Sequence, residues 1–144
     1  MSATLSLART SFASGVASAG AATGEVRWIL RGEGLALFIA ATAAYARLHL
    51  GWGEFALLFL APDLSFVAYL AGPRWGAAVY NLAHSTIAPL AFLGAGLALG
   101  ASPFLGIGLI ALAHIGFDRA AGFGLKYSSS FHDAHLGALG RREA

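Results

Sequence analysis

Residues 103–121 read PFLGIGLIALAHIGFDRAA, an apolar run that contains His114 and, four residues later, Asp118. A run of about 20 apolar residues is the length a helix needs to cross the hydrocarbon core of a bilayer. An ionisable side chain near the bilayer centre costs at least about 2.5–3.5 kcal/mol. The stretch therefore predicts a membrane-spanning helix with a polar face, because residues four apart lie on the same side of a helix.

Three further apolar stretches of similar length precede this one, namely residues 28–50, 55–71 and 75–99. Glycine- and proline-containing segments separate the stretches at 51–53, 72–74 and 100–103, and such segments end helices and turn the chain. Short loops pack successive helices as antiparallel neighbours. The sequence thus predicts an all-α integral membrane bundle of four transmembrane helices.

The composition agrees with a membrane protein. Of the 144 residues, 58% are hydrophobic and 11% are charged, and the mean hydropathy is +0.70. A soluble domain carries about a quarter charged residues. The nine Lys and Arg residues are scattered between apolar runs, which excludes nucleic acid as a partner. Cysteine is absent, which excludes disulfides and thiolate metal sites.

The chain divides into three parts. Residues 1–26 are rich in Ala, Ser and Gly and are expected to form a disordered or flexible tail. Residues 27–122 form the transmembrane domain, and residues 123–144 a C-terminal segment. For that segment two alternatives stay open: a short amphipathic helix that carries His132 and His135 on one face, capped by the three serines at 128–130, or a solvated tail.

The basic residues predict the orientation. Four crossings place both termini on the same side of the membrane, and eight of the nine Lys and Arg residues fall on that side, Arg47 being the exception. Positive charge accumulates on the cytoplasmic side. We therefore expect a multi-pass protein of the bacterial cytoplasmic (inner) membrane with both termini in the cytoplasm.

Five ionisable residues lie within the apolar stretches. Asp63, His84, His114 and Asp118 lie inside them, and Glu33 lies near the start of the first. Because none of these groups can face lipid, we expect them to converge on one polar interior. Pro62 directly precedes Asp63 and is expected to kink the second helix beside that carboxylate.

These residue types predict a site for metal or acid–base chemistry. The candidate catalytic residues are Asp63, His84, His114, Asp118 and Glu33. The candidate metal ligands are His84, His114 and Asp118, with Asp63 and His135 as further ligands. Imidazole and carboxylate ligands suit zinc or iron better than calcium, although the spacing matches no named metal motif. Without a metal, a buried carboxylate would act as a general acid.

Three functions remain open. The first is an intramembrane enzyme whose lipid-like substrate, such as a prenyl chain, a terpenoid or a lipid ester, arrives from the bilayer. The second is a non-catalytic structural or accessory subunit of a larger membrane complex, in which the polar groups hydrogen-bond across helices. The third is a small proton-coupled carrier that works as a homo-oligomer. The buried ionisable groups favour the enzyme, because a spacer would be more stable without them.

Several short segments of residues 28–140 carry a resemblance to a known family. They are Arg31–Gly34, Pro62–Ser65, Gly72–Arg74, Tyr80–His84, His114–Arg119, Gly122–Tyr127 and Asp133–Gly137. With these segments the chain resembles a family of small bacterial integral-membrane proteins known as domain of unknown function four-two-six-zero. The resemblance implies the four-helix architecture and the importance of these polar positions. It implies no activity or substrate.

Overall fold

A computed structural model describes residues 20–129 and 132–137 of the chain. Its helices are α2 (Gly24–Ala46), α3 (Trp52–Phe59), the 3₁₀ helix η1 (Ala61–Ala71), α4 (Pro73–His84), α5 (Ile87–Leu99) and α6 (Ser102–Ala121). Within the described residues, the only extended pairing is an isolated bridge between Lys126 and Ala134. Four helical stretches are long and apolar enough to cross a membrane: Gly24–Ala46, Trp52–Ala71, Pro73–Leu99 and Ser102–Ala121. The predicted all-α class with four spans is confirmed.

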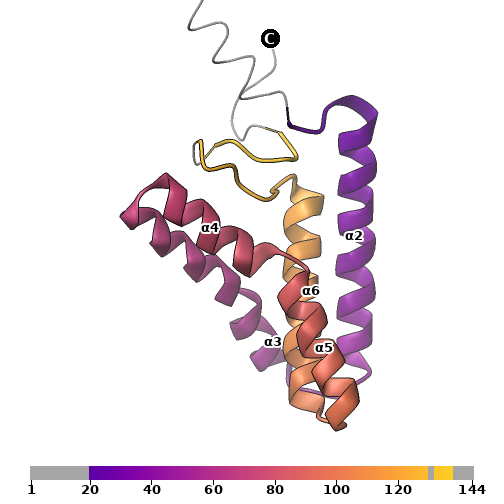
Figure 1. Ribbon diagram of the computed structural model, residues 1–144. Coiled ribbons are helices and arrows are strands. Elements are labelled where there is room, and N and C mark those ends of the chain that lie inside the picture. The colour runs from indigo at the N-terminus through magenta and orange to yellow at the C-terminus, as the bar shows by residue number, and fades with distance from the viewer. Residues whose placement is uncertain (1–19, 130–131, 138–144) are drawn as a thin grey trace, which may run out of the picture.

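Helices α2 and α6 lie side by side along their length (Figure 1) and form what we call the scaffold pair. Glycines allow their backbones to touch. A Cβ atom on Gly116 would lie 2.5 Å from the backbone nitrogen of Phe38, and one on Gly34 would lie 2.9 Å from the carbonyl oxygen of Gly116. Small residues at such contacts let membrane helices approach closely, so these glycines set the distance between the two helices.

The second span changes its helix type close to its middle. Helix α3 ends at Phe59 and η1 begins at Ala61. The break lies beside Pro62, whose missing N–H and bulky ring prevent a regular α-helix from continuing. The regular α-helix thus ends beside the proline at which the sequence predicts a kink.

The third span is also broken, which the sequence analysis did not predict. Helix α4 ends at His84, Ser85 has an extended backbone with ψ 150°, and α5 begins at Ile87. The physical reason is Pro89, because a proline ring clashes with the carbonyl group four residues earlier in a helix. That residue is Ser85, so the missed signal is a proline inside an otherwise helical run.

The two breaks create a separate substructure. Helices η1 and α4 pack against each other as a hairpin, residues 61–84, which leans away from the scaffold pair (Figure 1). We call this hairpin the arm. Helix η1 contains no buried residue, and Leu70 near its end is 90% exposed. Such an apolar exterior suits a lipid environment.

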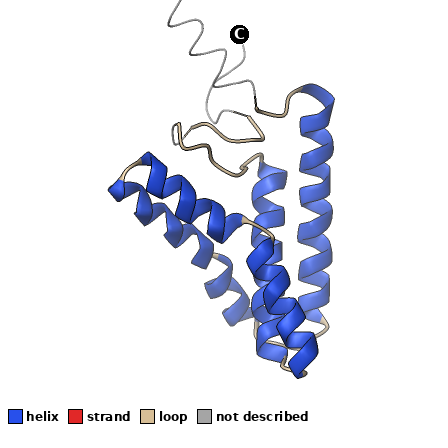
Figure 2. Cartoon of the chain, in the orientation of Figure 1, coloured by secondary structure: helices blue, strands red, loops and turns tan. Residues whose placement is uncertain are grey.

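The segment that follows α6 contains no helix in its described residues 122–129 and 132–137, so the predicted amphipathic helix is wrong there (Figure 2). The backbone N–H of Tyr127 donates to the carbonyl of Asp133 over 2.9 Å, and that of His135 donates to Leu125 over 3.0 Å. Ser129 donates to the Asp133 carboxylate at 2.8 Å. The serine thus holds a turn instead of capping a helix. Residues 130–131 and 138–144 lie outside the described residues, and so does the part of the predicted helix that falls on them.

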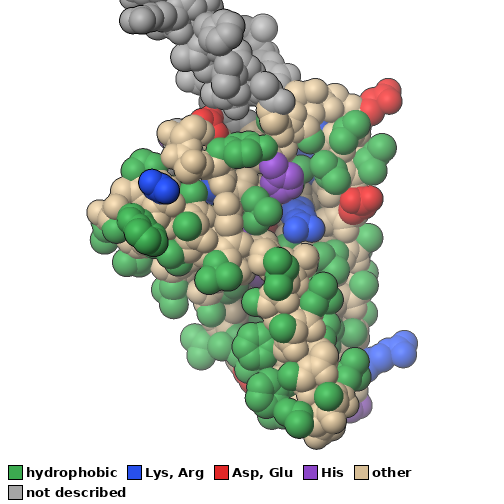
Figure 3. Space-filling model, viewed as in Figure 1, with side chains coloured by type: hydrophobic (Ala, Val, Ile, Leu, Met, Phe, Trp, Pro, Cys, Tyr) green, Lys and Arg blue, Asp and Glu red, His purple; other side chains and the backbone are tan. Residues whose placement is uncertain are grey.

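Side-chain types are unevenly distributed over the surface. On the face shown in Figure 3, hydrophobic side chains cover most of the helices, and most of the charged side chains gather toward the end that carries the C-terminal segment. This distribution agrees with an apolar band that meets lipid and a polar end that meets water.

Candidate functional site

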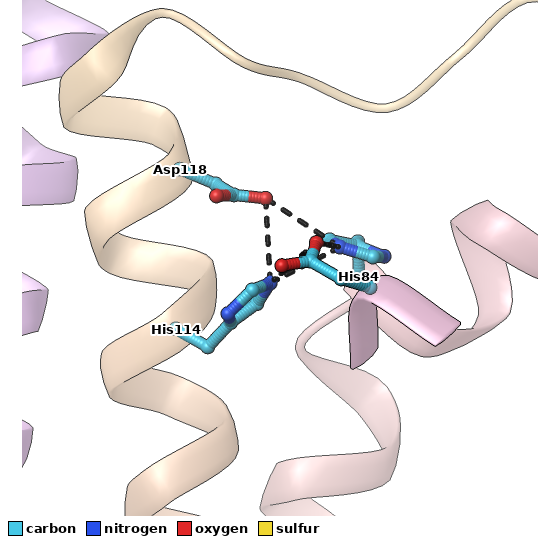
Figure 4. Close-up of side chains that lie close together, drawn as sticks. His84, His114 and Asp118 are labelled. Carbon is cyan, nitrogen blue, oxygen red and sulfur yellow. Dashed lines mark hydrogen bonds and ion pairs between the residues drawn. The ribbon is translucent and has the colours of Figure 1, made fainter. Parts of the chain in front are cut away.

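Four polar side chains meet where the two broken spans approach α6. Asp63 lies in the first turn of η1 and His84 is the last residue of α4, while His114 and Asp118 lie one turn apart on α6. In Figure 4, His84 points from the arm toward His114 and Asp118 on the scaffold. The breaks therefore place arm residues within reach of α6, and we call these four residues the His/Asp cluster.

The distances within the His/Asp cluster are short. The two Nε2 atoms of His84 and His114 lie 3.2 Å apart. Each Nε2 atom lies 3.5 Å from Oδ2 of Asp118. The corresponding distances to Oδ1 of Asp63 are 3.7 Å for His84 and 3.6 Å for His114. All four atoms lie within 4.8 Å of one another, so the cluster can hold a metal ion.

The hydrogen bonds of His84 determine which of its nitrogens faces the cluster as an acceptor. Its Nδ1 atom lies 2.9 Å from the carbonyl oxygen of Tyr80. A carbonyl can only accept, so Nδ1 carries a proton, and Nε2 of the neutral ring presents a lone pair to the cluster. Histidines that ligate metals use this same arrangement, in which the second ring nitrogen donates to a carbonyl.

His114 lacks a comparable partner. Its Nδ1 atom is buried and has no hydrogen-bond partner among the described residues. The ring is instead held by packing, because Phe59 contacts it edge-on with ring centroids 5.2 Å apart. Tyr80 stacks on His84 with centroids 3.8 Å apart. Both imidazoles are therefore fixed in orientation by aromatic neighbours.

Five of the six separations between the ligand atoms of the cluster are close to those around a tetrahedral ion. Ligand atoms about 2.0–2.2 Å from such an ion lie roughly 3.3–3.6 Å from one another. The five measured separations of 3.2–3.7 Å, between the two nitrogens and from each nitrogen to each aspartate oxygen, agree with this geometry. The donor set of two imidazoles and two carboxylates also suits zinc or iron.

Burial differs between the four residues. His84 and His114 are 4% and 2% exposed, and the side chain of Asp118 is 16% exposed. The side chain of Asp63 is 42% exposed. The cluster is thus closed by the scaffold and by the end of α4, and it opens on the side of Asp63.

The space beside the cluster is small. A cavity lined by His84, Asp118 and Tyr80, together with residues of α6 and of the C-terminal segment, has a volume of about 10 Å³. That is room for about one water molecule. This cavity is therefore too small for a lipid-like molecule, whereas the side chain of Asp63 is half exposed.

Lys126 is a charged neighbour that the sequence analysis did not assign to the site. It is buried, with Nζ 5.7 Å from the centroid of the Tyr80 ring. Burial lowers the pKa of Lys126, and the nearby Asp118 carboxylate acts in the opposite direction. The signal in the sequence was a lone lysine within the Gly122–Tyr127 segment, but only the fold brings it close to Asp118.

Asn81 fixes the backbone of Lys126. Its Oδ1 accepts the N–H of Lys126 over 2.7 Å, and its Nδ2 donates to the carbonyl of the same residue over 2.8 Å. The arm and the C-terminal segment are thereby joined at one point. We conclude that Asn81, one turn before His84, positions the segment that carries the buried lysine.

Glu33 and His135 lie outside the His/Asp cluster. Glu33 is exposed on α2, and Nδ1 of His135 accepts the backbone N–H of Leu125 over 2.8 Å. Both line a second cavity of about 260 Å³, together with Arg119. The expected convergence of the polar groups thus holds for Asp63, His84, His114 and Asp118, and the first span contributes no residue to it.

The fold and the site together define a helical membrane protein with two histidines and two aspartates gathered where two of its spans are broken. The chain belongs to the family described as Domain of unknown function (DUF4260), whose model matches residues 27–139. The resemblance found in the sequence is therefore confirmed. No curated protein and no solved structure matches the chain.

Proposed function

We propose that this protein is a metal-dependent membrane enzyme in which the His/Asp cluster holds a zinc or iron ion and acts on a lipid-like substrate. The proposal rests on one observation, namely that several hydrogen-bond acceptor atoms meet in the His/Asp cluster. Nε2 of His84 and the two carboxylates are all acceptors, and His114 can donate at most one proton from Nε2. A divalent cation would satisfy all of them and balance the two negative charges.

The buried members of the cluster are assigned as ligands. His84, His114 and Asp118 form a two-histidine, one-carboxylate set, which serves catalytic zinc and non-haem iron. When bound, the metal would supply a Lewis acid and make water nucleophilic at neutral pH. Lys126 is placed to offset the charge of Asp118.

Asp63 is assigned a different role because it lies on the open side. Its half-exposed carboxylate faces both imidazoles and can also meet an arriving substrate. We assign it as the group that orients a water molecule and accepts its proton. The apolar exterior of η1, including Leu64 and Leu70, favours a substrate with a prenyl, terpenoid or acyl chain.

One observation favours a second candidate, a structural site in an accessory subunit. Four protein ligands close a structural zinc site, and the cavity beside the cluster has a volume of only about 10 Å³. In that reading, the ion clamps the arm to the scaffold and no reaction takes place.

Metal analysis of the purified protein tests the ion itself. We expect about one zinc or iron per chain in the wild type, and none in His84→Ala or His114→Ala, while His132→Ala serves as the control because His132 is exposed and outside the cluster. A competition titration of the wild type with a chromophoric chelator measures the metal affinity directly. It needs no variant, so misfolding of a variant cannot affect it. Absence of stoichiometric metal after loading with both ions would sink the proposal.

Cobalt substitution separates the enzyme from the structural site. The visible spectrum of Co²⁺ reports its coordination number, and azide can bind only where a coordination position exchanges. We expect azide to change the spectrum of the wild type and of Asp63→Asn, because Asp63 is not required as a ligand. A spectrum that azide leaves unchanged in both proteins supports the structural site instead.

We also propose that both ends of the chain face the cytoplasm of a bacterial cell. Arg27, Arg31 and Arg119 lie at the same end of the scaffold pair, and Arg47 lies at the other, which supports this orientation. Because the chain has no cysteine, single replacements are informative. We expect Ser129→Cys to resist an impermeant thiol reagent in intact cells and Arg47→Cys to react.

A further inference from the structure

Three arginines gather at one end of the scaffold pair. Arg27 and Arg31 lie in the first turns of α2, and Arg119 lies in the last turn of α6. A Cβ atom on Gly122 would lie 3.9 Å from a terminal nitrogen of Arg27 and 3.9 Å from the central guanidinium carbon of Arg31. The two guanidinium groups therefore flank the same point of the backbone.

Within the part of the chain that the structure describes, these arginines have no carboxylate partner. Among the described residues, the ion pairs at 4.0 Å or less join the histidines and aspartates of the His/Asp cluster and include none of the three. Arg31 donates from Nε to the carbonyl of Ala120 over 2.8 Å. Nε of Arg27 is buried and has no hydrogen-bond partner in residues 20–129 and 132–137. An arginine that merely faced water would not bury a donor in this way.

A cavity of about 260 Å³ opens beside this group. Its wall combines two polar side chains on the scaffold, Arg119 and Glu33, with His135 of the C-terminal segment, and its apolar lining includes Leu30 and Leu37 of α2. Because Nδ1 of His135 accepts a hydrogen bond, the neutral ring carries its proton on Nε2. Burial lowers the pKa of His135, a hydrogen bond with the Leu125 backbone opposes this, and the charge of Arg119 lowers the pKa as well, so that the net shift favours the neutral ring. The cavity thus offers a guanidinium and a neutral N–H donor beside an apolar wall.

We infer that this cavity, with Arg27 and Arg31 at the same end of the scaffold pair, binds a phosphate-bearing anion, either the headgroup of an anionic phospholipid or free phosphate. Guanidinium groups bind phosphate oxygens through paired N–H donors. Basic pockets between membrane helices on the cytoplasmic side hold anionic headgroups. Exposed Glu33 is suited to accept a hydrogen bond from a headgroup hydroxyl, as in a glycerol headgroup. None of the four cluster residues lines this cavity, so the inference does not rest on the proposed enzyme.

The test titrates the detergent-purified full chain with phosphatidylglycerol, with phosphatidylcholine and, separately, with inorganic phosphate, and follows binding by native mass spectrometry and thermal stability. We expect phosphatidylglycerol to bind more tightly than phosphatidylcholine. Arg27→Gln and Arg119→Gln should each weaken that binding roughly fivefold. Arg47→Gln, an arginine at the opposite end of α2, is the matched control and should bind as the wild type does.

The titration with inorganic phosphate identifies the source of the anion. Competition by inorganic phosphate shows that the site takes free phosphate, and lack of competition with retained lipid binding assigns the headgroup. Arg119→Lys keeps the charge and should retain binding, which guards against a folding defect in Arg119→Gln. The inference is overturned if Arg27→Gln and Arg119→Gln bind as tightly as Arg47→Gln, or if neither phosphatidylglycerol nor phosphate is preferred over phosphatidylcholine.

Discussion

The scaffold pair and the arm are both built from apolar helices, but different contacts hold them. In the scaffold pair, Gly34 and Gly116 bring two backbones into contact, and much of α6 is buried. In the arm, η1 has no buried residue, and it packs mainly against α4. The arm meets α6 of the scaffold pair at the His/Asp cluster and meets the C-terminal segment at Asn81. One region is therefore held by packing, whereas the attachment of the other depends on a polar site.

The largest expected effect comes from removing the metal that we propose. One proposed ligand, His84, lies on the arm, and the other two, His114 and Asp118, lie on α6, so the ion would tie the regions together. In a metal-loaded protein, chelation should speed amide hydrogen exchange at least about a hundredfold in residues 73–84 and leave residues 106–116 unchanged. Equal acceleration in both segments, or none in either, would contradict the distinction between arm and scaffold.

A substitution at the helix contact should instead destabilise the scaffold. Gly116→Ala places a Cβ atom 2.5 Å from the nitrogen of Phe38, and overpacking of this kind costs about 1–3 kcal/mol. Thermal unfolding in detergent should show the loss. Gly94→Ala on α5 is the matched control, because a Cβ there meets nothing within 4 Å and alanine favours helix. If both variants unfold alike, packing at Gly116 does not hold the scaffold.

A smaller effect is expected at the joint between the arm and the C-terminal segment. Asn81→Ala removes both side-chain hydrogen bonds to Lys126, each worth about 1 kcal/mol. Unfolding should reveal a loss of about 1–2 kcal/mol, and zinc affinity should fall with it. Ser85→Ala, which removes a longer and exposed bond of 3.3 Å to Leu82, should change neither quantity. Wild-type zinc affinity in Asn81→Ala would show that the joint does not support the cluster.

The smallest effect is a pH dependence from His135. Its pKa is lowered from the usual 6.5 in the folded protein, first by burial. The unfolded chain therefore binds the proton more readily, and the free energy of unfolding falls as pH drops below about 6.5. One proton changes that free energy by at most about 1.4 kcal/mol per pH unit. His135→Asn should flatten the dependence between pH 7.5 and 5, and an unchanged slope would argue against a buried neutral ring.

The sequence allowed much of this architecture to be predicted. The lengths of the apolar runs required four spans, and Pro62 indicated the break in the second. The penalty for ionisable groups in lipid was enough to predict that Asp63, His84, His114 and Asp118 would meet. The break beside Ser85 was missed because a long apolar run hides one proline, Pro89, whose effect falls four residues upstream.

Other features depended on contacts between residues far apart in the chain. Glu33 has the same chemistry as Asp63, yet it lies on the exposed side of α2, because helix rotation is set by the contacts of Gly34. His135 and Lys126 lie in a segment that folds without a helix in its described residues, so their places depend on pairing with Leu125 and Asn81. Sequence spacing carries no information about such pairings.

The sequence by itself determined that this is a four-span membrane protein with ionisable groups that must be hidden from lipid, because hydrophobic length and the cost of burying charge are local properties of the chain. Only the tertiary structure decided which groups share a site and which line a separate cavity. The physical reason is that the rotation of each helix, and the positions of the two breaks, follow from close packing between helices that are distant in sequence.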